Sequence, residues 1–207
     1  MGHDIGLVFL RPDADLEETL APFNEQDEKY MVFVDKTDEV KEAFDKLPDS
    51  CPSEGTYIEE INQTDRVNDN WAHQASKEKY PTLDAYAKGY YDYKRVNGRY
   101  GYFSNPNAKY DWYIEGGRWD GYITNSVGAK TNREMLMEVD WEKTDVPSHF
   151  VNADGEWCEK GKLGWFGITT NEKPKEDWNA KFKDYVRTLI ADEEAEEIQV
   201  VAIDFHI

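Results

Sequence analysis

The chain has 207 residues, a formal net charge of −19, 14% aromatic residues and two cysteines. Seven Trp, thirteen Tyr and nine Phe side chains can bury a sizeable core, so the composition excludes a disordered chain. The two cysteines lie far apart and outside any C-x-x-C pair, which excludes a disulfide scaffold, and no apolar run is long enough to cross a membrane.

The acidic residues are concentrated in the first 60 positions, which hold 17 Asp and Glu against 5 Lys and Arg. A field of this sign repels phosphate backbones and attracts basic surfaces. We therefore expect no direct binding of bare nucleic acid, whereas a protein partner with a basic surface is compatible with the charge. The acidity is equally compatible with a role in solubility alone.

In the first half of the chain, residues 4–10 (DIGLVFL) form an apolar run that predicts a buried strand, and residues 29–37 (KYMVFVDKT) predict a second strand. Residues 38–47 have apolar side chains at helical spacing and acids in the first turn, which predicts a helix. Residues 48–81 are irregular, and we expect loops and a short helix there. Residues 81–93 predict another helix, with Pro at or near its start.

In the second half, residues 97–107 predict a hairpin-like turn, a short strand and another turn. Asp154-Gly155 lies between two alternating runs and predicts a tight hairpin, and residues 164–169 predict the strand that follows it. Residues 174–190 place their apolar side chains on one helical face, and residues 198–207 predict a closing strand inside a sheet.

These elements do not repeat with a period, and strands and helices do not alternate regularly. We therefore predict an α+β fold with a mainly antiparallel sheet and helices packed on one side of it. The first and last strands are both apolar enough to be central, so we expect the N-terminal and C-terminal strands to be neighbours. The predicted organisation is a single domain over residues 1–207, with an irregular inserted region at about residues 48–97.

Residues 105–119 (NPNAKYDWYIEGGRW) combine crowded aromatic rings, a glycine pair and an arginine. A glycine pair allows positive φ or a close backbone approach, and a guanidinium beside free backbone N–H groups can hold an anion. Trp and Tyr rings could flank a flat ligand. The alternative is a packed corner of the fold, with Arg118 paired to Asp111 or Glu115. The candidate ligand-binding residues are Asp111, Trp112, Tyr113, Gly116, Gly117, Arg118 and Trp119.

The four histidines, at positions 3, 73, 149 and 206, show no compact metal-binding spacing, so the sequence predicts no metal motif and identifies no cofactor. Antiparallel pairing of the first and last strands would bring His3 and Asp4 near Asp204 and His206. Two imidazoles and two carboxylates could then do acid–base chemistry or hold a metal, with Arg118 holding an anionic substrate. The alternative is a pair of inert histidines at frayed ends, and parallel pairing would separate them.

The stretch NPNAKYDWYIEGGRWDGY resembles a W-D-W-Y-x-x-G-G-R-W signature found in a family of small uncharacterised bacteriophage and prophage proteins. The likeness extends to FVNADGEWCEKGKLGWFGITTNEK, to the end VVAIDFHI and to the opening DIGLVFL with LEETLAPFNE. Tyr110 stands where the pattern usually has Trp, and Phe205 where Cys is common. The resemblance implies a phage or prophage origin and a cytoplasmic location in the infected cell, and it brings no catalytic residues.

Three functions follow as hypotheses. The first is an acidic cytoplasmic protein that binds a host macromolecule with a basic surface, as a counter-defence or host-modulating factor. The second is a small enzyme or binding protein acting on a nucleotide or another anionic small molecule. The third is a structural role, such as a minor virion component.

Overall fold

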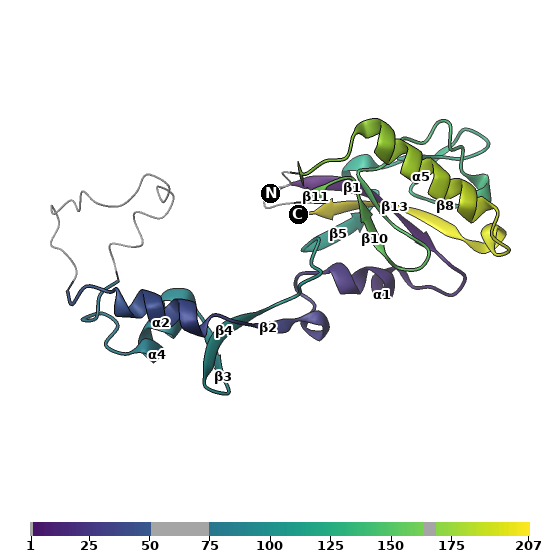
Figure 1. The fold of residues 1–207 in the computed structure, drawn as a ribbon. Helices are drawn as coiled ribbons and strands as arrows, with labels where there is room; N and C mark the ends of the chain where they lie inside the picture. Colours follow the sequence, from purple (N-terminus) through teal and green to yellow (C-terminus); the bar gives the residue numbers. More distant parts are fainter. Residues whose placement is uncertain (1, 51–74, 164–168) are drawn as a thin grey trace. The chain divides into compact units, whose positions relative to one another are not determined.

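The computed structural model describes residues 2–50, 75–163 and 169–207 of the chain (Figure 1). The chain divides into two compact units. The outer unit consists of Met1–Met31 and Asn105–Ile207, and the inserted unit consists of Val32–Ser104. The insertion therefore begins before the predicted limit of about residue 48, and its described part has regular helices and strands around a separate core.

The outer unit is built on a six-stranded sheet in the order β10-β9-β1-β13-β5, with β8 also paired to β13. Only the β1–β9 pair of this sheet is parallel, while its other pairs are antiparallel. The predicted α+β class, the mainly antiparallel sheet and the pairing of the terminal strands are confirmed. The strands are β1 (His3–Leu10), β5 (Trp112–Glu115), β8 (Arg133–Met135), β9 (His149–Val151), β10 (Trp157–Glu159) and β13 (Gln199–His206).

Strands β1 and β13 are central because both of their faces are apolar, as the sequence predicted for residues 4–10 and 198–207. Alternate side chains enter two different clusters on the two sides of the sheet. On the helix face, Leu7 and Phe9 pack with α5 (Lys175–Ile190). On the opposite face, Val8 and Leu10 pack with Leu20 of the short helix α1 (Leu16–Leu20). Figure 1 shows α5 and α1 on either side of the sheet.

Helix α5 confirms the prediction for residues 174–190, because its buried side chains all lie on the predicted apolar face. Its acidic first turn and its single Arg in the last turn suit the helix dipole. The buried side chains of α5 are Trp178, Phe182, Val186 and Leu189.

The predicted hairpin at Asp154-Gly155 is also present, between β9 and β10. Gly155 has a φ of 80°, which a glycine adopts without steric cost, and its N–H donates to the carbonyl of Asn152 at 2.9 Å. The strand predicted at residues 164–169 lies almost entirely outside the described residues. A small ladder joins β11 (Lys162–Leu163) to β12 (Thr169–Thr170).

Short elements complete the outer unit and connect its strands. Strands β6 and β7 form a separate two-stranded ladder. The short elements are η1 (Ala21–Phe23), η2 (Glu28–Tyr30), η3 (Gly117–Trp119), β6 (Ile123–Thr124), β7 (Lys130–Thr131), η4 (Leu136–Glu138) and η6 (Ala195–Glu197).

The inserted unit has a three-stranded sheet in the order β2-β4-β3, with two helices. Its core contains Val40, Tyr86 and Tyr100, one from each helix and one from the central strand. Its elements confirm the strand and helix predicted over residues 29–47, the helix over residues 81–93, and the turn and strand after residue 97. Its elements are β2 (Val32–Asp35), α2 (Thr37–Asp45), α4 (Leu83–Tyr91), β3 (Lys94–Val96) and β4 (Arg99–Ser104).

Candidate functional site

The register of β1 and β13 brings two histidines together at one end of the main sheet. His3 is the direct partner of His206, and the two imidazole rings lie edge to face with their centroids 5.0 Å apart. Both side chains point to the helix face, because they alternate with residues that point to the opposite one. Their exposed fractions are small, at 12% for His3 and 7% for His206.

Each of these histidines is held by its own carboxylate. The Nδ1 atom of His3 lies 2.8 Å from Oδ1 of Asp204, which is 3% exposed, and Nδ1 of His206 lies 2.6 Å from Oδ1 of Asp111. An Nδ1–H that donates to a carboxylate fixes the ring orientation and leaves Nε2 as the exchangeable position. In the described part of the chain, neither Nε2 atom has a hydrogen-bond partner.

Trp112 covers one side of this pair. Its indole stacks on His206 with a centroid distance of 4.7 Å and an interplanar angle of 13°, and it meets His3 edge to face at 5.3 Å. Trp112 is nevertheless 42% exposed, so part of the indole remains open to solvent. The backbone N–H of Trp112 donates to Oδ1 of Asp111, which links the aromatic ring and the carboxylate of the second histidine.

The glycine pair brings the next loop onto Asp204. Gly116 and Gly117 have φ values of 73° and 54°, in the left-handed region. A Cβ on Gly117 would lie 2.5 Å from Oδ2 of Asp204, and one on Gly116 would lie 2.3 Å from the amide of Asn132. A side chain at either position would clash, so both positions require glycine. The loop can then come close enough for the backbone N–H of Arg118 to donate to Oδ2 of Asp204 at 2.9 Å.

The guanidinium of Arg118 is exposed and makes no ion pair with any residue that the structure describes. In a packed corner of the fold, Arg118 would pair with Asp111 or Glu115, but both of these carboxylates have other partners. Asp111 holds His206, and Glu115 accepts from Arg133 at 3.0 Å. We refer to His3, Asp111, Trp112, Arg118, Asp204 and His206 as the paired-histidine site.

Three predicted candidates lie outside this site. Asp4 and Tyr113 lie on the opposite face of the sheet, because adjacent residues of a strand point to opposite sides. Tyr113 packs there against Tyr110, with a centroid distance of 5.7 Å. Trp119 is half-buried against the core cluster that contains α5, so its ring serves packing.

Asp4 instead faces His149, a residue that the sequence analysis did not select. Nδ1 of His149 lies 3.5 Å from Oδ2 of Asp4, too far for a strong hydrogen bond, and neither ring nitrogen has a partner among the described residues. The ring is fully buried and stacks on Trp157 at 4.5 Å. The only sequence signal for it is a histidine inside the apolar strand HFV.

The residues around His149 and the half-buried Asp4 determine the environment of this pair. Burial works to raise the pKa of Asp4, but His149, Ser148 and the backbone of Ile5 together hold that pKa below its ordinary value. Gly6 leaves room for the imidazole, since a Cβ there would lie 2.6 Å from Nε2 of His149.

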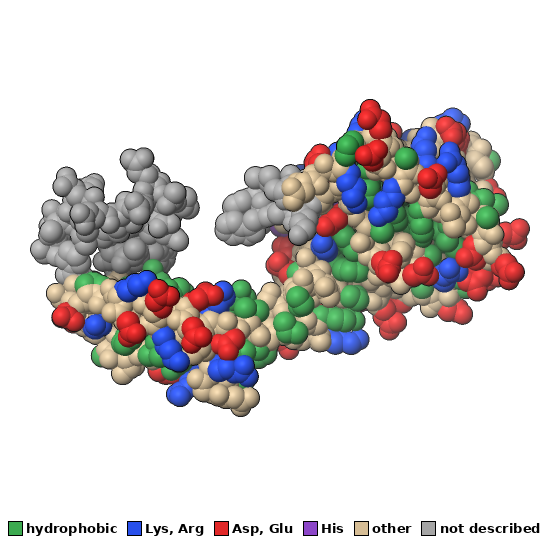
Figure 2. Space-filling view, in the orientation of Figure 1, with side chains coloured by type: hydrophobic (Ala, Val, Ile, Leu, Met, Phe, Trp, Pro, Cys, Tyr) green, Lys and Arg blue, Asp and Glu red, His purple; other side chains and the backbone are tan. Residues whose placement is uncertain are grey.

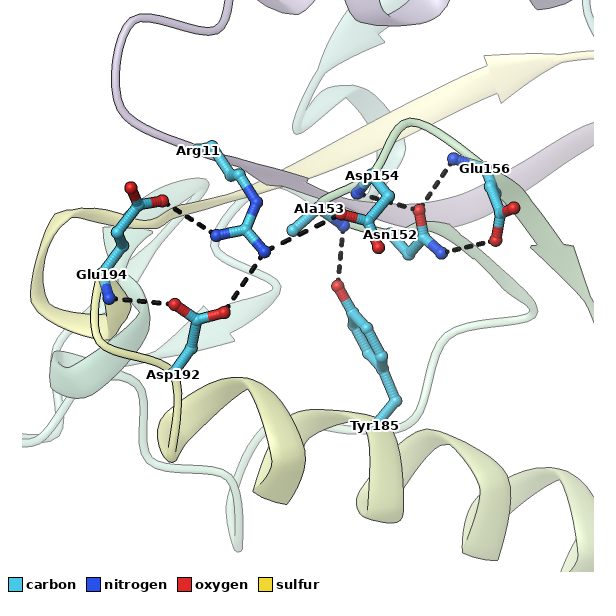
Figure 3. A network of polar contacts seen from close by, with 8 residues as sticks. All are labelled: Arg11, Asn152, Ala153, Asp154, Glu156, Tyr185, Asp192 and Glu194. Atoms are coloured by element: carbon cyan, nitrogen blue, oxygen red, sulfur yellow. Dashed lines mark hydrogen bonds and ion pairs between the residues drawn. The ribbon is translucent and has the colours of Figure 1, made fainter.

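A second polar network lies in the outer unit, around Arg11 and Tyr185 (Figure 3). Arg11 donates to Glu194 at 2.9 Å and to Asp192 at 3.2 Å, and these carboxylates raise the pKa of its guanidinium. The backbone N–H of Ala153 donates to the hydroxyl of Tyr185 at 2.7 Å. This network joins the turn after β1, the end of α5 and the β9–β10 hairpin, and its cation is fully paired, unlike Arg118.

Neither known proteins nor standard types of site assign a function to this chain. Comparison with protein-family models, curated proteins and solved structures gave no match. Among the residues described here, no three His, Cys, Asp or Glu side chains are arranged to hold a metal ion. None of the described helices is both long enough and apolar enough to span a membrane.

Proposed function

We propose that the paired-histidine site binds a small anionic ligand with a flat ring, of the nucleotide class, and performs acid–base chemistry on it. The observation that carries this proposal is that His3 and His206 are each fixed by a carboxylate through Nδ1, side by side. A histidine with a fixed tautomer and an open Nε2 is suited to accept or donate a proton.

The preference for an anion follows from which charges are already paired. Asp204 uses one oxygen for His3 and the other for the backbone of Arg118. Asp111 accepts from both His206 and the backbone of Trp112. Arg118 joins the site through its backbone N–H, and its exposed side chain has no ion pair with the described residues. A guanidinium suits a phosphate or carboxylate, so we expect this side chain to reach the anionic group of the ligand.

The preference for a flat ring follows from Trp112. One side of its indole stacks on His206, and its 42% exposure leaves surface for a second ring. Stacking of a base on an aromatic side chain contributes about 1 to 3 kcal/mol. A nucleotide combines this ring with the phosphate that Arg118 would hold.

Thermal-shift and NMR titrations of the whole protein with nucleoside monophosphates test the binding. Binding to the folded state raises the unfolding temperature by mass action and shifts the imidazole signals of His3 and His206. Arg118→Ala is expected to weaken binding, while Arg99→Ala, an exposed arginine of the inserted unit, is expected to leave it unchanged. If no nucleotide shifts either signal, or if Arg118→Ala binds as tightly as the parent, the proposal is wrong.

The acid–base role has a separate test. His206→Gln should retain nucleotide binding better than it retains turnover, because a ring that transfers protons matters most in the transition state. Any activity found should therefore show a pH profile that changes in His3→Gln and His206→Gln. Binding without turnover on any nucleotide would reduce the proposal to a ligand-binding protein.

A second candidate function is docking onto a basic host protein, with the phage or prophage origin suggested by the resemblance and a cytoplasmic setting. Exposed acids gather at the end of the outer unit where α5 turns into β13 (Figure 2). Arg11 lies between this turn and the one after β1, and is already paired. At this end of the outer unit, four exposed acids have no ion pair with another described residue: Asp13, Glu193, Glu196 and Glu197.

Charge substitution at this acidic end tests the docking function. Replacing Glu193, Glu196 and Glu197 by Gln should weaken capture of a host protein at low salt, because exposed charges steer association and are screened by salt. The control replaces three exposed acids of the inserted unit, Asp38, Glu39 and Glu42, which are already paired with lysines of the same unit. Equal capture by both variants would contradict docking through this end.

A further inference from the structure

The outer unit contains a pocket of about 110 Å³ that shares no residue with the paired-histidine site. It lies between α5 and the segment before β9, in the region where Figure 2 shows basic and apolar side chains together. The residues that line it include Trp141, Glu142, Phe182, Lys183, Val186 and Arg187.

The apolar part of the pocket wall is held by the core. Phe182 and Val186 are 3% and 4% exposed, and Trp141 stacks on Phe9 at a centroid distance of 6.1 Å. Trp141 also meets Phe182 edge to face at 5.9 Å. Because these rings are fixed by their neighbours, the pocket is formed without a ligand, as is usual for small-molecule sites.

The rim carries both signs of charge. Lys183 and Glu142 are exposed, and neither makes an ion pair with another residue in the described ranges. Arg187, one helical turn after Lys183, is paired with Asp184 at 2.8 Å. A partly apolar pocket that also carries an unpaired cation and an unpaired anion, among the described residues, matches a small zwitterion.

The volume of the pocket limits the size of the apolar group that a ligand can place in it. Water occupies about 30 Å³ per molecule in the liquid, and a cavity of about 150 Å³ accepts benzene. A pocket of about 110 Å³ therefore suits a branched aliphatic group better than an aromatic ring.

We infer that this pocket binds a free branched-chain amino acid. The aliphatic side chain packs against Trp141, Phe182 and Val186, the carboxylate faces Lys183, and the ammonium faces Glu142. The site is independent of the nucleotide site proposed above, so each can fail without the other.

Calorimetric titration of the full chain with L-leucine tests this inference. We expect saturable binding with a Kd no weaker than about 10 mM. The analogues 4-methylpentanoate and 3-methylbutylamine each lack one charge and should bind about two- to fivefold more weakly, the range for exposed charge pairs. L-Phenylalanine should also bind more weakly than leucine, because its ring exceeds the pocket.

Surface variants locate the binding without disturbing the core. Lys183→Gln and Glu142→Gln should each weaken leucine binding by the same two- to fivefold, about the effect of removing the matching charge from the ligand. Lys175→Gln, on the same helix but outside the pocket, is the control and should bind as the parent does. Absence of saturable leucine binding overturns the inference. The inference is also contradicted if all three variants bind leucine equally well, or if the protein binds phenylalanine more tightly than leucine.

Discussion

On the helix face of the main sheet, His3 and His206 each donate to a carboxylate and lie beside a tryptophan that is 42% exposed. On the opposite face, at the same end of the same sheet, His149 is fully buried under Trp157, and neither of its ring nitrogens has a partner among the described residues. The chemistry of a histidine is thus determined here by which face its position in the strand selects.

This difference between the two faces of the sheet indicates which of them is suited to a function. A histidine with a paired Nδ1 and access to solvent can exchange a proton at Nε2, while a ring enclosed by Trp157, Phe205 and Gly6 acts mainly as a flat core side chain. The buried side should therefore control stability, and the open side should control binding. Four substitutions test this division, from the largest expected effect to the smallest.

Gly6→Ala should destabilise the protein most. The added Cβ would lie 2.6 Å from Nε2 of His149 and 2.8 Å from a ring carbon of Phe205, so the buried side must repack. Overpacking of this kind costs about 1 to 3 kcal/mol in the free energy of unfolding, and we expect the upper end. Urea denaturation measures the loss, and His149→Ala combined with Gly6→Ala should recover part of it, because the ring that clashes is gone. If the losses in unfolding free energy of Gly6→Ala and His149→Ala simply add in the double variant, the predicted clash between the two positions is wrong.

Gly117→Ala should have the next largest effect, on the open side. A left-handed φ costs a residue with a Cβ about 1 to 2 kcal/mol, and the Cβ would also press on Asp204. Gly128→Ala is the matched control, because Gly128 has a φ of 83° and nothing within 4 Å of its Cβ position. The extra loss in Gly117→Ala over Gly128→Ala isolates the contact with Asp204. We expect this variant, unlike the control, to shift the NMR signals of His3.

Asp4→Asn should alter the pH dependence of stability. The folded-state pKa of Asp4 lies below its ordinary value, so its carboxylate stabilises the native state above that ordinary value, and the contribution is lost as the pH falls through the folded pKa. Between about pH 5 and about pH 2, the unfolding free energy of Asp4→Asn should therefore fall less steeply than that of the parent. Asp13→Asn, at an exposed turn, is the control. Parallel curves for Asp4→Asn and the parent would show that the carboxylate contributes nothing.

His149→Phe should have the smallest effect on stability. Phe retains the stacking on Trp157, and the 3.5 Å contact with Asp4 that is lost is too long for a strong hydrogen bond. The expected change in unfolding free energy is within about 1 kcal/mol of zero. Nucleotide binding at the paired-histidine site should not change. A loss of binding in this variant would mean that the two faces do not act separately.

Much of the fold followed from local pattern. The apolar runs at both ends predicted the central pair β1 and β13, and the spacing in residues 174–190 predicted α5 with its buried face. The extent of the inserted unit did not follow, because β2 finds its partner β4 almost 70 positions later. That pairing depends on tertiary contacts that no local pattern encodes.

The candidate site could be predicted only in part, again because local pattern does not encode tertiary contacts. Antiparallel register alone brought His3, Asp204 and His206 together, and the glycine pair brought Arg118 to them. Asp4 lies at the predicted end of the sheet, but its side chain does not join the two histidines, because a strand turns alternate side chains to opposite faces. His149 was missed because the groups that enclose it come from three other strands, β1, β10 and β13.

The pairing of β1 with β13 also has a consequence for folding rate. His3 and Asp204 are 201 positions apart, so the centre of the sheet is a contact of very high sequence separation. Closing such a loop costs entropy before any of the sheet contacts are gained, which makes folding slow and leaves β1 without its partner until β13 is available. During that interval an apolar strand is exposed, so aggregation of newly made chains should rise steeply with their concentration.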